Sequence, residues 1–99
     1  MRVIWSPRAL ERVVEIGEFI ARDQPTAAAH WVEGIFAAAK RLEAFPRSGR
    51  HIPEGERPDL REVLHNAWRL IYRTHLSSVI ILTVRHSRQP LSPDDPELQ

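Results

Sequence analysis

The sequence predicts an α+β fold in which an N-terminal strand and an αα-hairpin pack on a small antiparallel sheet, in the order β-α-α-β-β-β. Two stretches within residues 7–45 carry apolar residues at helical spacing, whereas residues 60–85 hold three apolar runs separated by short turns. The chain has 99 residues and no cysteine, so disulfides and thiolate metal sites are excluded. This length suits a single domain with one hydrophobic core.

The first elements are a short strand and two helices. Residues 2–5 form an apolar strand candidate, and Ser6-Pro7 begins a helix because Ser is a favourable N-cap and Pro fits the first helical position. This helix is expected to reach about Arg22, and its core stripe is predicted to contain Leu10, Val13, Val14, Gly17, Ile20 and Ala21. A second helix is expected from Pro25-Thr26 until Phe45-Pro46 ends it.

The second half of the chain predicts a loop, a meander and a tail. Residues 46–58 contain three prolines and two glycines, which indicates a long exposed connection without regular structure. Strands are expected at 60–65, 68–74 and 79–85, and the last, almost wholly apolar, should be buried on both faces. Residues 89–99, with three prolines, are expected to be a disordered tail, which leaves residues 1–88 as the domain.

The N-terminus lacks the apolar core of a signal peptide, and the longest apolar run, Val79–Leu82, is too short to span a bilayer. We therefore expect a cytoplasmic protein without membrane insertion.

Positive charge is concentrated in the C-terminal half of the expected domain. The net charge is only +1, but three of the 13 acids lie between residues 94 and 97. Residues 60–88 contain five Arg and three His against one acid, Glu62. Arginine is favoured where a planar, permanent cation meets phosphate or carboxylate, so this region predicts an anionic partner.

Strand alternation gives these arginines a geometry. Residues 69, 71 and 73 share one face of their strand, opposite residues 68, 70 and 72. If the latter pack under the helices, the former stand on an uncovered face that is basic with an apolar centre. The predicted partner-binding residues are Arg61, Arg69, Ile71, Arg73, Arg85 and Arg88. An ion pair with Glu62 on the adjacent strand is an alternative role for Arg69.

Taken together, the order of elements and the local sequence resemble the ParE/RelE superfamily of bacterial type II toxins, closer to ParE. The resemblance covers roughly residues 3–88 and depends on the order and spacing of several pieces, none of which is specific alone. The matching pieces are Trp5-Ser6-Pro7 with Ala9, Ile20-Ala21, Asp23-Gln24-Pro25 with Ala27-Ala28, Leu42-Glu43-Ala44-Phe45-Pro46 with Gly49-Arg50, Arg61-Glu62-Val63, Trp68-Arg69-Leu70-Ile71-Tyr72-Arg73 and Val84-Arg85-His86-Ser87-Arg88.

This resemblance implies a toxin encoded beside an antitoxin that wraps a helix and an extended segment over it in a hetero-oligomeric complex. RelE-like members cleave messenger RNA on the ribosome, whereas ParE-like members poison DNA gyrase and lack the nuclease residues. Fold alone does not choose between these branches. No cofactor or metal is expected, because the histidines lack metal-ligand spacing.

A nuclease would need a general base, a general acid and cations at the phosphate. The candidates are Arg69, Arg85 and His86, and among them only His86 titrates near neutral pH. RelE-like nucleases carry lysines in the strand before the conserved arginine, or a carboxylate near a C-terminal His and Tyr. Residues 60–65 contain no lysine and no Tyr follows His86, which favours gyrase inhibition over RNA cleavage. A non-toxic protein-interaction module of the same fold is a further alternative.

Overall fold

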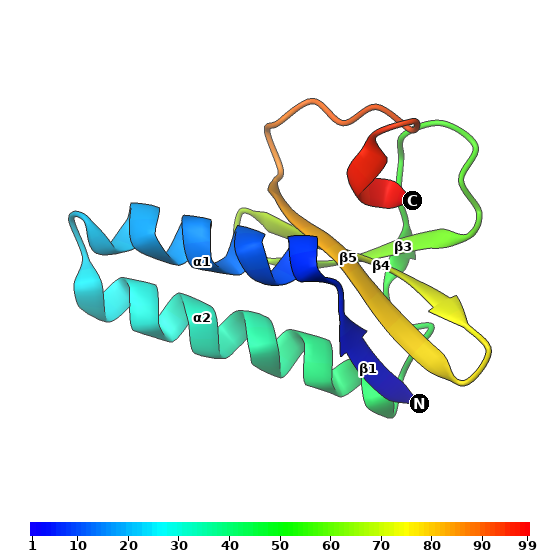
Figure 1. The fold of residues 1–99 in the computed structure, drawn as a ribbon, viewed down its shortest axis with the longest axis horizontal. Coiled ribbons are helices and arrows are strands. Elements are labelled where there is room, and N and C mark those ends of the chain that lie inside the picture. Colours follow the sequence, from blue (N-terminus) through cyan, green and yellow to red (C-terminus); the bar gives the residue numbers. More distant parts are fainter.

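The computed structural model describes residues 1–99 as two helices packed against a five-stranded sheet (Figure 1). The elements are β1 (Arg2–Trp5), α1 (Pro7–Ala21), α2 (Pro25–Lys40), the 3-10 turn η1 (Arg41–Glu43), β2 (Arg50–His51), β3 (Leu60–His65), β4 (Trp68–His75), β5 (Ser78–His86) and the 3-10 turn η2 (Pro96–Leu98). The strand order is β1-β5-β4-β3-β2. Neither helix is both long enough and apolar enough to cross a membrane.

The predicted α+β order is confirmed, with two additions. The first strand joins the meander by pairing parallel to β5, so the sheet is mixed rather than wholly antiparallel. The expected irregular loop contains the short strand β2, which pairs with β3 through Arg50↔Glu62 and His51↔Arg61.

The start of α1 is fixed by Ser6. Its Oγ accepts a hydrogen bond from the Ala9 N–H at 3.0 Å, and its own N–H donates to the Ile81 carbonyl at 3.0 Å. The buried residues of α1 are Ala9, Val13 and Ile16, whereas Leu10 and Val14 of the predicted stripe are 42% and 57% exposed. Two adjacent rows of residues on a helix surface have the same sequence spacing. Periodicity alone therefore did not identify which row of apolar residues faces the core.

The position of β5 explains its apolar sequence. It lies between β1 and β4, and Val79 and Ile81 pack toward the helices while Leu82 packs on the opposite side. The pairing of β5 with β4 is irregular opposite Ile71 and Tyr72. At this irregularity the consecutive residues Leu82 and Thr83 are both buried. The prediction that this strand is buried on both faces is confirmed.

The sheet separates two hydrophobic clusters. The larger lies between the helices and the sheet and includes Trp31, Ile35, Leu70 and Tyr72. The second lies on the opposite face, which the sequence predicted to be uncovered, and consists of Ile52, Leu60, Ile71, Leu82, Leu91 and Leu98. Loop residues and the chain's C-terminal segment thus cover this face.

Residues 89–99, here termed the C-terminal strap, differ from the expected disordered tail. The strap crosses the sheet face and ends in η2 (Figure 1), with Leu91 and Leu98 only 8% and 1% exposed. The prolines and acidic residues of the strap suggested disorder. Two buried leucines and carboxylates paired with arginines instead stabilise its ordered conformation.

The hydroxyl of Tyr72 provides a test of the packing beneath the loop. It donates to the Pro46 carbonyl at 2.8 Å and accepts from the Gly49 N–H at 3.0 Å. Tyr72→Phe leaves the Gly49 donor buried without a partner, so we expect a loss of about 1–3 kcal/mol in the free energy of unfolding. Urea denaturation measures this loss, and a stability equal to that of the parent chain would show that water satisfies both groups.

Candidate functional site

Arg69 is the centre of a buried ion-pair cluster. Its Nε donates to Glu62 Oε1 at 2.6 Å, and its two terminal nitrogens donate to the Glu54 carboxylate at 2.7 and 2.6 Å. Arg69 is 4% exposed and the Glu62 side chain is fully buried, with Arg50 donating to its second oxygen at 2.7 Å. The hydrogen bonds from Arg69 lower the pKa of Glu54 despite its partial burial.

This geometry corrects the predicted exposed role of Arg69. A desolvated guanidinium needs counter-charges, and the loop supplies Glu54 while β3 supplies Glu62. The alternative of an ion pair with Glu62 is therefore the observed arrangement. Ile71, the expected apolar centre of the binding face, is 0% exposed under the same loop and the strap.

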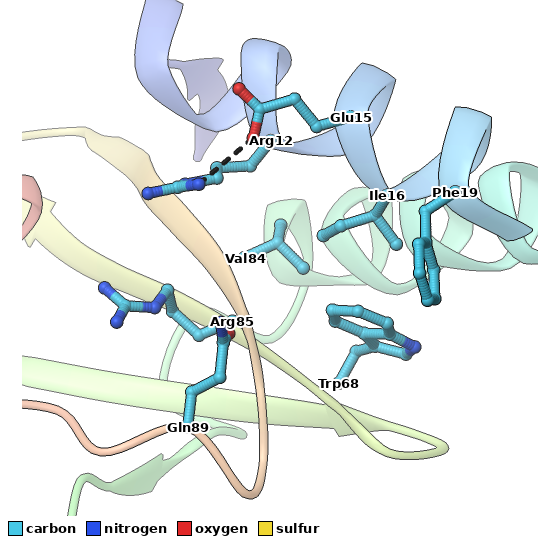
Figure 2. A pocket seen from close by; sticks show the side chains of 8 residues that line it. All are labelled: Arg12, Glu15, Ile16, Phe19, Trp68, Val84, Arg85 and Gln89. Atoms are coloured by element: carbon cyan, nitrogen blue, oxygen red, sulfur yellow. Dashed lines mark hydrogen bonds and ion pairs between the residues drawn. The ribbon is translucent and has the colours of Figure 1, made fainter.

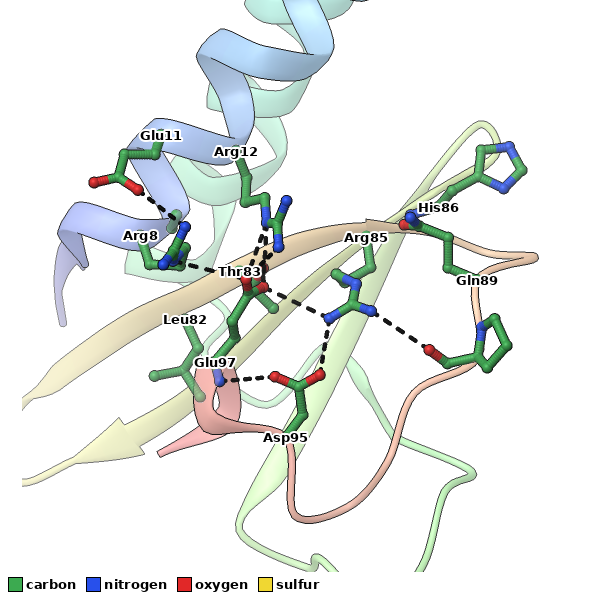
Figure 3. A network of polar contacts seen from close by, with 12 residues as sticks. Arg8, Glu11, Arg12, Leu82, Thr83, Arg85, His86, Gln89, Asp95 and Glu97 are labelled. Atoms are coloured by element: carbon green, nitrogen blue, oxygen red, sulfur yellow. Dashed lines mark hydrogen bonds and ion pairs between the residues drawn. The ribbon is translucent and has the colours of Figure 1, made fainter.

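Glu97 of the strap is the centre of a second cluster (Figure 3). Its carboxylate accepts hydrogen bonds from Arg12 of α1 and, at 2.7 Å, from the Thr83 hydroxyl, and it lies 3.7 Å from Arg8 and 3.6 Å from Arg85. Burial raises the pKa of Glu97, but the hydrogen bonds from Arg12 and Thr83 lower it by a larger amount. The pKa of Glu97 therefore lies below its ordinary value.

Arg85 connects this cluster to the rest of the strap. It donates to Asp95 at 3.1 Å and to the Pro90 carbonyl at 3.4 Å, and its side chain is only 13% exposed. Arg85 was expected to bind a partner protein, but in this structure its guanidinium binds the strap.

The cluster lies where β5 loses a neighbour. β1 pairs with β5 only from Ser78 to Ile81, so residues beyond Ile81 have no strand on that side. The Ser6 hydroxyl donates to the Leu82 carbonyl there at 3.1 Å. The next residues on this stretch contact the strap: the Thr83 hydroxyl donates a hydrogen bond to Glu97, and Arg85 forms an ion pair with Asp95. Side chains from α1 and the strap therefore enclose an otherwise open strand edge.

The three other predicted arginines lie in different surroundings. Arg61 is on the helix-facing side of β3, opposite Tyr72, and donates to the Gly49 carbonyl at 2.8 Å. Arg73 is partly exposed and Arg88 is exposed, and neither side chain forms an ion pair or a hydrogen bond within the chain. Arg73 and Arg88 are the members of the predicted set that remain available to a partner.

The nuclease candidates are divided between the two faces of the sheet. Arg69 pairs directly with Arg85, so their side chains share the strap-covered face. His86 pairs with Trp68 on the helix-facing side, where the two rings meet edge to face with centroids 4.9 Å apart. The histidine and the arginines therefore do not converge on one position.

A second histidine lies on the helix-facing side. His65 pairs with Trp68 from β3, so His65 and His86 flank the same indole. The His65 ring fills the space beside Gly34, where an added Cβ would lie 2.4 Å from its Cε1 and Nε2. Side-chain alternation along β3 and β4 indicates that His65 and Trp68 share a face, but only once the pairing register of the two strands is known.

A shallow cleft lined in part by Trp68 is a further feature that the sequence did not predict (Figure 2). Phe19, which is 62% exposed, and Trp68 flank its apolar part, and the polar rim is formed by Arg12, Glu15, Arg85 and Gln89. This arrangement suits an apolar side chain of a partner protein with polar groups around it. The structure contains no group of three or more His, Asp or Glu side chains able to hold a metal ion.

Comparisons with known proteins give consistent similarities. The family model described as "ParE toxin of type II toxin-antitoxin system, parDE" matches residues 3–91. The protein named "Putative toxin Y4kP" from Sinorhizobium fredii (strain NBRC 101917 / NGR234) is 39% identical over 89 residues, covering 89% of this chain and 90% of that protein.

Two solved structures share the fold. A chain of the chromosomal ParDE TA system from P. aeruginosa aligns with a TM-score of 0.75 at 21% identity, covering 87% of this chain and 95% of that one. The YoeB/ParE toxin from Agrobacterium tumefaciens aligns with a TM-score of 0.61 at 18% identity, covering 87% and 98%.

Removal of Arg69 tests its structural role. Arg69→Ala leaves Glu54 and Glu62 without their shared cation in a desolvated site, so we expect a loss of about 3–5 kcal/mol in stability. Arg88→Ala is the control, since that exposed side chain has no partner and should change stability by less than about 0.5 kcal/mol. Equal stabilities of the two variants, measured by urea denaturation, would contradict the role of Arg69.

The carboxylates of the two clusters predict acid sensitivity. The pKa values of Glu54, Asp95 and Glu97 are all lowered in the folded chain. Their stabilisation is complete above the ordinary values of 4.5 for Glu and 3.8 for Asp, and it is lost as pH falls through the lower folded values. We expect the unfolding free energy of Glu97→Gln to fall less steeply than that of the parent chain over this acidic range; parallel profiles would refute the assignment for Glu97.

Proposed function

This chain belongs to the ParE family of toxins of type II toxin-antitoxin systems, and from that premise we propose that it inhibits DNA gyrase and is neutralised by a cognate antitoxin. The proposal places its action in the cytoplasm, where gyrase acts on chromosomal DNA. A ParE-type toxin acts by binding a partner protein. The proposed function therefore requires an exposed binding surface and does not require a catalytic acid–base pair.

Arg69 and Arg85 lie on the opposite face of the sheet from His86, and this separation is the observation that favours gyrase over messenger RNA as the target. RNA cleavage requires proton-transfer groups and phosphate-binding cations around one reacting phosphate. Here both arginines lie on the strap-covered face with carboxylate partners, and His86 lies on the opposite side against Trp68. This separation supports binding over nuclease chemistry.

Exposed groups supply a candidate surface for the partners. Leu10, Val14 and Phe36 are large apolar side chains that are 42%, 57% and 40% exposed on the helices. Phe36 packs on Trp5 of β1 with ring centroids 4.8 Å apart, so it is held in place at the surface. These residues support antitoxin or gyrase binding on the outer side of the αα-hairpin. The free cations Arg73 and Arg88 supply further positive charge at opposite ends of the β4–β5 pair.

The alternative activity is ribosome-dependent cleavage of messenger RNA. The observation in its favour is that His65 and His86 flank Trp68 on one side of the sheet. An indole stands between the two imidazoles, however, and His65 is packed against Gly34. A third possibility, a non-toxic interaction module, uses the same surface and predicts no effect on growth.

The deciding measurement combines two assays on the purified protein. We expect inhibition of gyrase supercoiling with accumulation of cleaved DNA, and intact message in a primer-extension assay on ribosomes. Cut message with unaffected gyrase would reverse the choice of target, and inactivity in both assays would favour the interaction module.

The surface cations can be tested with a matched pair of variants. Arg73→Glu combined with Arg88→Glu reverses two unpaired charges beside the sheet, and we expect it to weaken gyrase inhibition at least tenfold while the chain stays folded. Arg22→Glu combined with Arg41→Glu makes the same change at two exposed positions that follow the C-terminal ends of α1 and α2. Equal activity of the two double variants would contradict the proposed surface.

A further inference from the structure

The two hairpin turns of the sheet have the same backbone conformation at their first residue but different residues there. Each turn contains two residues, 66–67 between β3 and β4 and 76–77 between β4 and β5. Asn66 and Leu76, the first residues, both have a φ of 54°. Gly and Asn tolerate this left-handed region, whereas it is an outlier for a bulky residue because the Cβ crowds the backbone. One turn therefore has a residue suited to its conformation, and the other does not.

The side chain of Leu76 obtains no burial from the rest of the chain. It is 87% exposed and belongs to neither hydrophobic cluster. A single exposed leucine is ordinary on a protein surface. A leucine that is exposed and also holds an unfavourable φ is not, because no contact within the chain compensates for the conformation. Backbone strain of this kind is concentrated at functional sites.

The turn that carries Leu76 is held in place by three strands. His75 of β4 pairs with Ser78 of β5, and Ser78 also pairs with Arg2 of β1. The Arg2 N–H donates to the Ser77 carbonyl at 3.2 Å. The turn lies at the opposite end of the molecule from the connection between α1 and α2 (Figure 1). An exposed side chain on such a fixed backbone is ordered in advance, which lowers the entropic cost of inserting it into a partner.

Positive groups lie beside the turn on one face of the sheet. Arg2, Ser78 and His75 form one row across three strands, so their side chains share a face, and Arg73 lies on that face two residues before His75. The Arg73 side chain forms no ion pair within the chain. β4 and β5 contain no Asp or Glu. A complementary surface therefore has an apolar pocket for the leucine and acidic groups at its border.

We propose that Leu76 is an apolar anchor that inserts into an acidic-bordered pocket of DNA gyrase, and that its unfavourable conformation is retained for this contact. The pocket supplies the burial that the chain itself does not provide. The identification of the partner as gyrase rests on the proposed function. The assignment of the anchor rests on the φ, the exposure and the neighbouring charges of Leu76.

Leu76→Asn separates the conformational cost from the contact. It gives this turn the residue type that the other turn has at position 66, and it removes the apolar side chain. We expect a higher midpoint of urea denaturation than that of the parent chain, because the strain is relieved. We also expect at least tenfold weaker binding of the fluorescently labelled chain to purified gyrase. A variant that merely misfolds would lose both stability and binding, so the opposite directions of the two changes identify a functional residue.

Asn66→Leu is the matched variant at the other turn. It places a leucine at the same φ, and we expect a lower denaturation midpoint with the gyrase affinity of the parent chain. Equal gyrase affinity of Leu76→Asn and the parent chain would overturn the proposal. An equal loss of affinity in both variants would also overturn it, as would a Leu76→Asn chain that is less stable than the parent.

Growth arrest on induction of each chain in cells separates the anchor from the target. If the parent arrests growth without binding gyrase and Leu76→Asn does not arrest growth, the target is refuted and Leu76 remains the anchor for a different protein. If both chains inhibit gyrase equally, the anchor alone is refuted. A parent chain that is a dimer in sedimentation velocity, beside a monomeric Leu76→Asn, would show that a second copy occupies this surface and would overturn the proposal. A parent chain without effect on growth or gyrase would overturn both proposals.

Discussion

The burial of the Arg69 guanidinium between Glu54 and Glu62 is the constraint on which one whole face of the molecule depends. The cation lies in the middle of the sheet, and its counter-charges come from an adjacent strand and from a long loop. Charge satisfaction therefore holds the loop against the sheet, where Ile52 joins Leu60 and Ile71. The resulting apolar floor receives Leu91 and Leu98, and the strap in turn brings Glu97 to the arginines of α1.

The sheet consequently separates two kinds of stabilisation. The helix-facing side is an ordinary core in which aromatic and aliphatic side chains of α2 meet β4 and β5. The opposite side combines a small apolar cluster with two carboxylate-centred ion-pair groups. The carboxylates with lowered pKa values, Glu54, Asp95 and Glu97, lie on the second side, so this side loses stabilisation when the pH falls below their ordinary values.

The sequence predicted those features that follow from local pattern. Ser6-Pro7 and Pro25 mark the helix starts as observed, and the apolar run of β5 correctly predicted a strand buried on both faces. Alternation correctly separated Arg69, Ile71 and Arg73 from Trp68, Leu70 and Tyr72. Arg85 and His86 were grouped as nuclease candidates, but the same rule, applied to these consecutive residues, places their side chains on opposite faces of the sheet.

What local pattern could not provide was the covering of the second face. Whether Glu54 reaches Arg69 depends on the path of a 13-residue loop, and whether Leu98 is buried depends on tertiary contacts with Leu82 and Leu60. Polar, proline-containing segments look alike in sequence when they are free and when they are fastened by a few long-range contacts. The strap also has a role beyond stability, because β5 has no strand partner beyond Ile81 on the side that the strap and α1 enclose. Unfastening it would leave Thr83 and Arg85, which lie on this unpaired stretch of β5, without their strap partners.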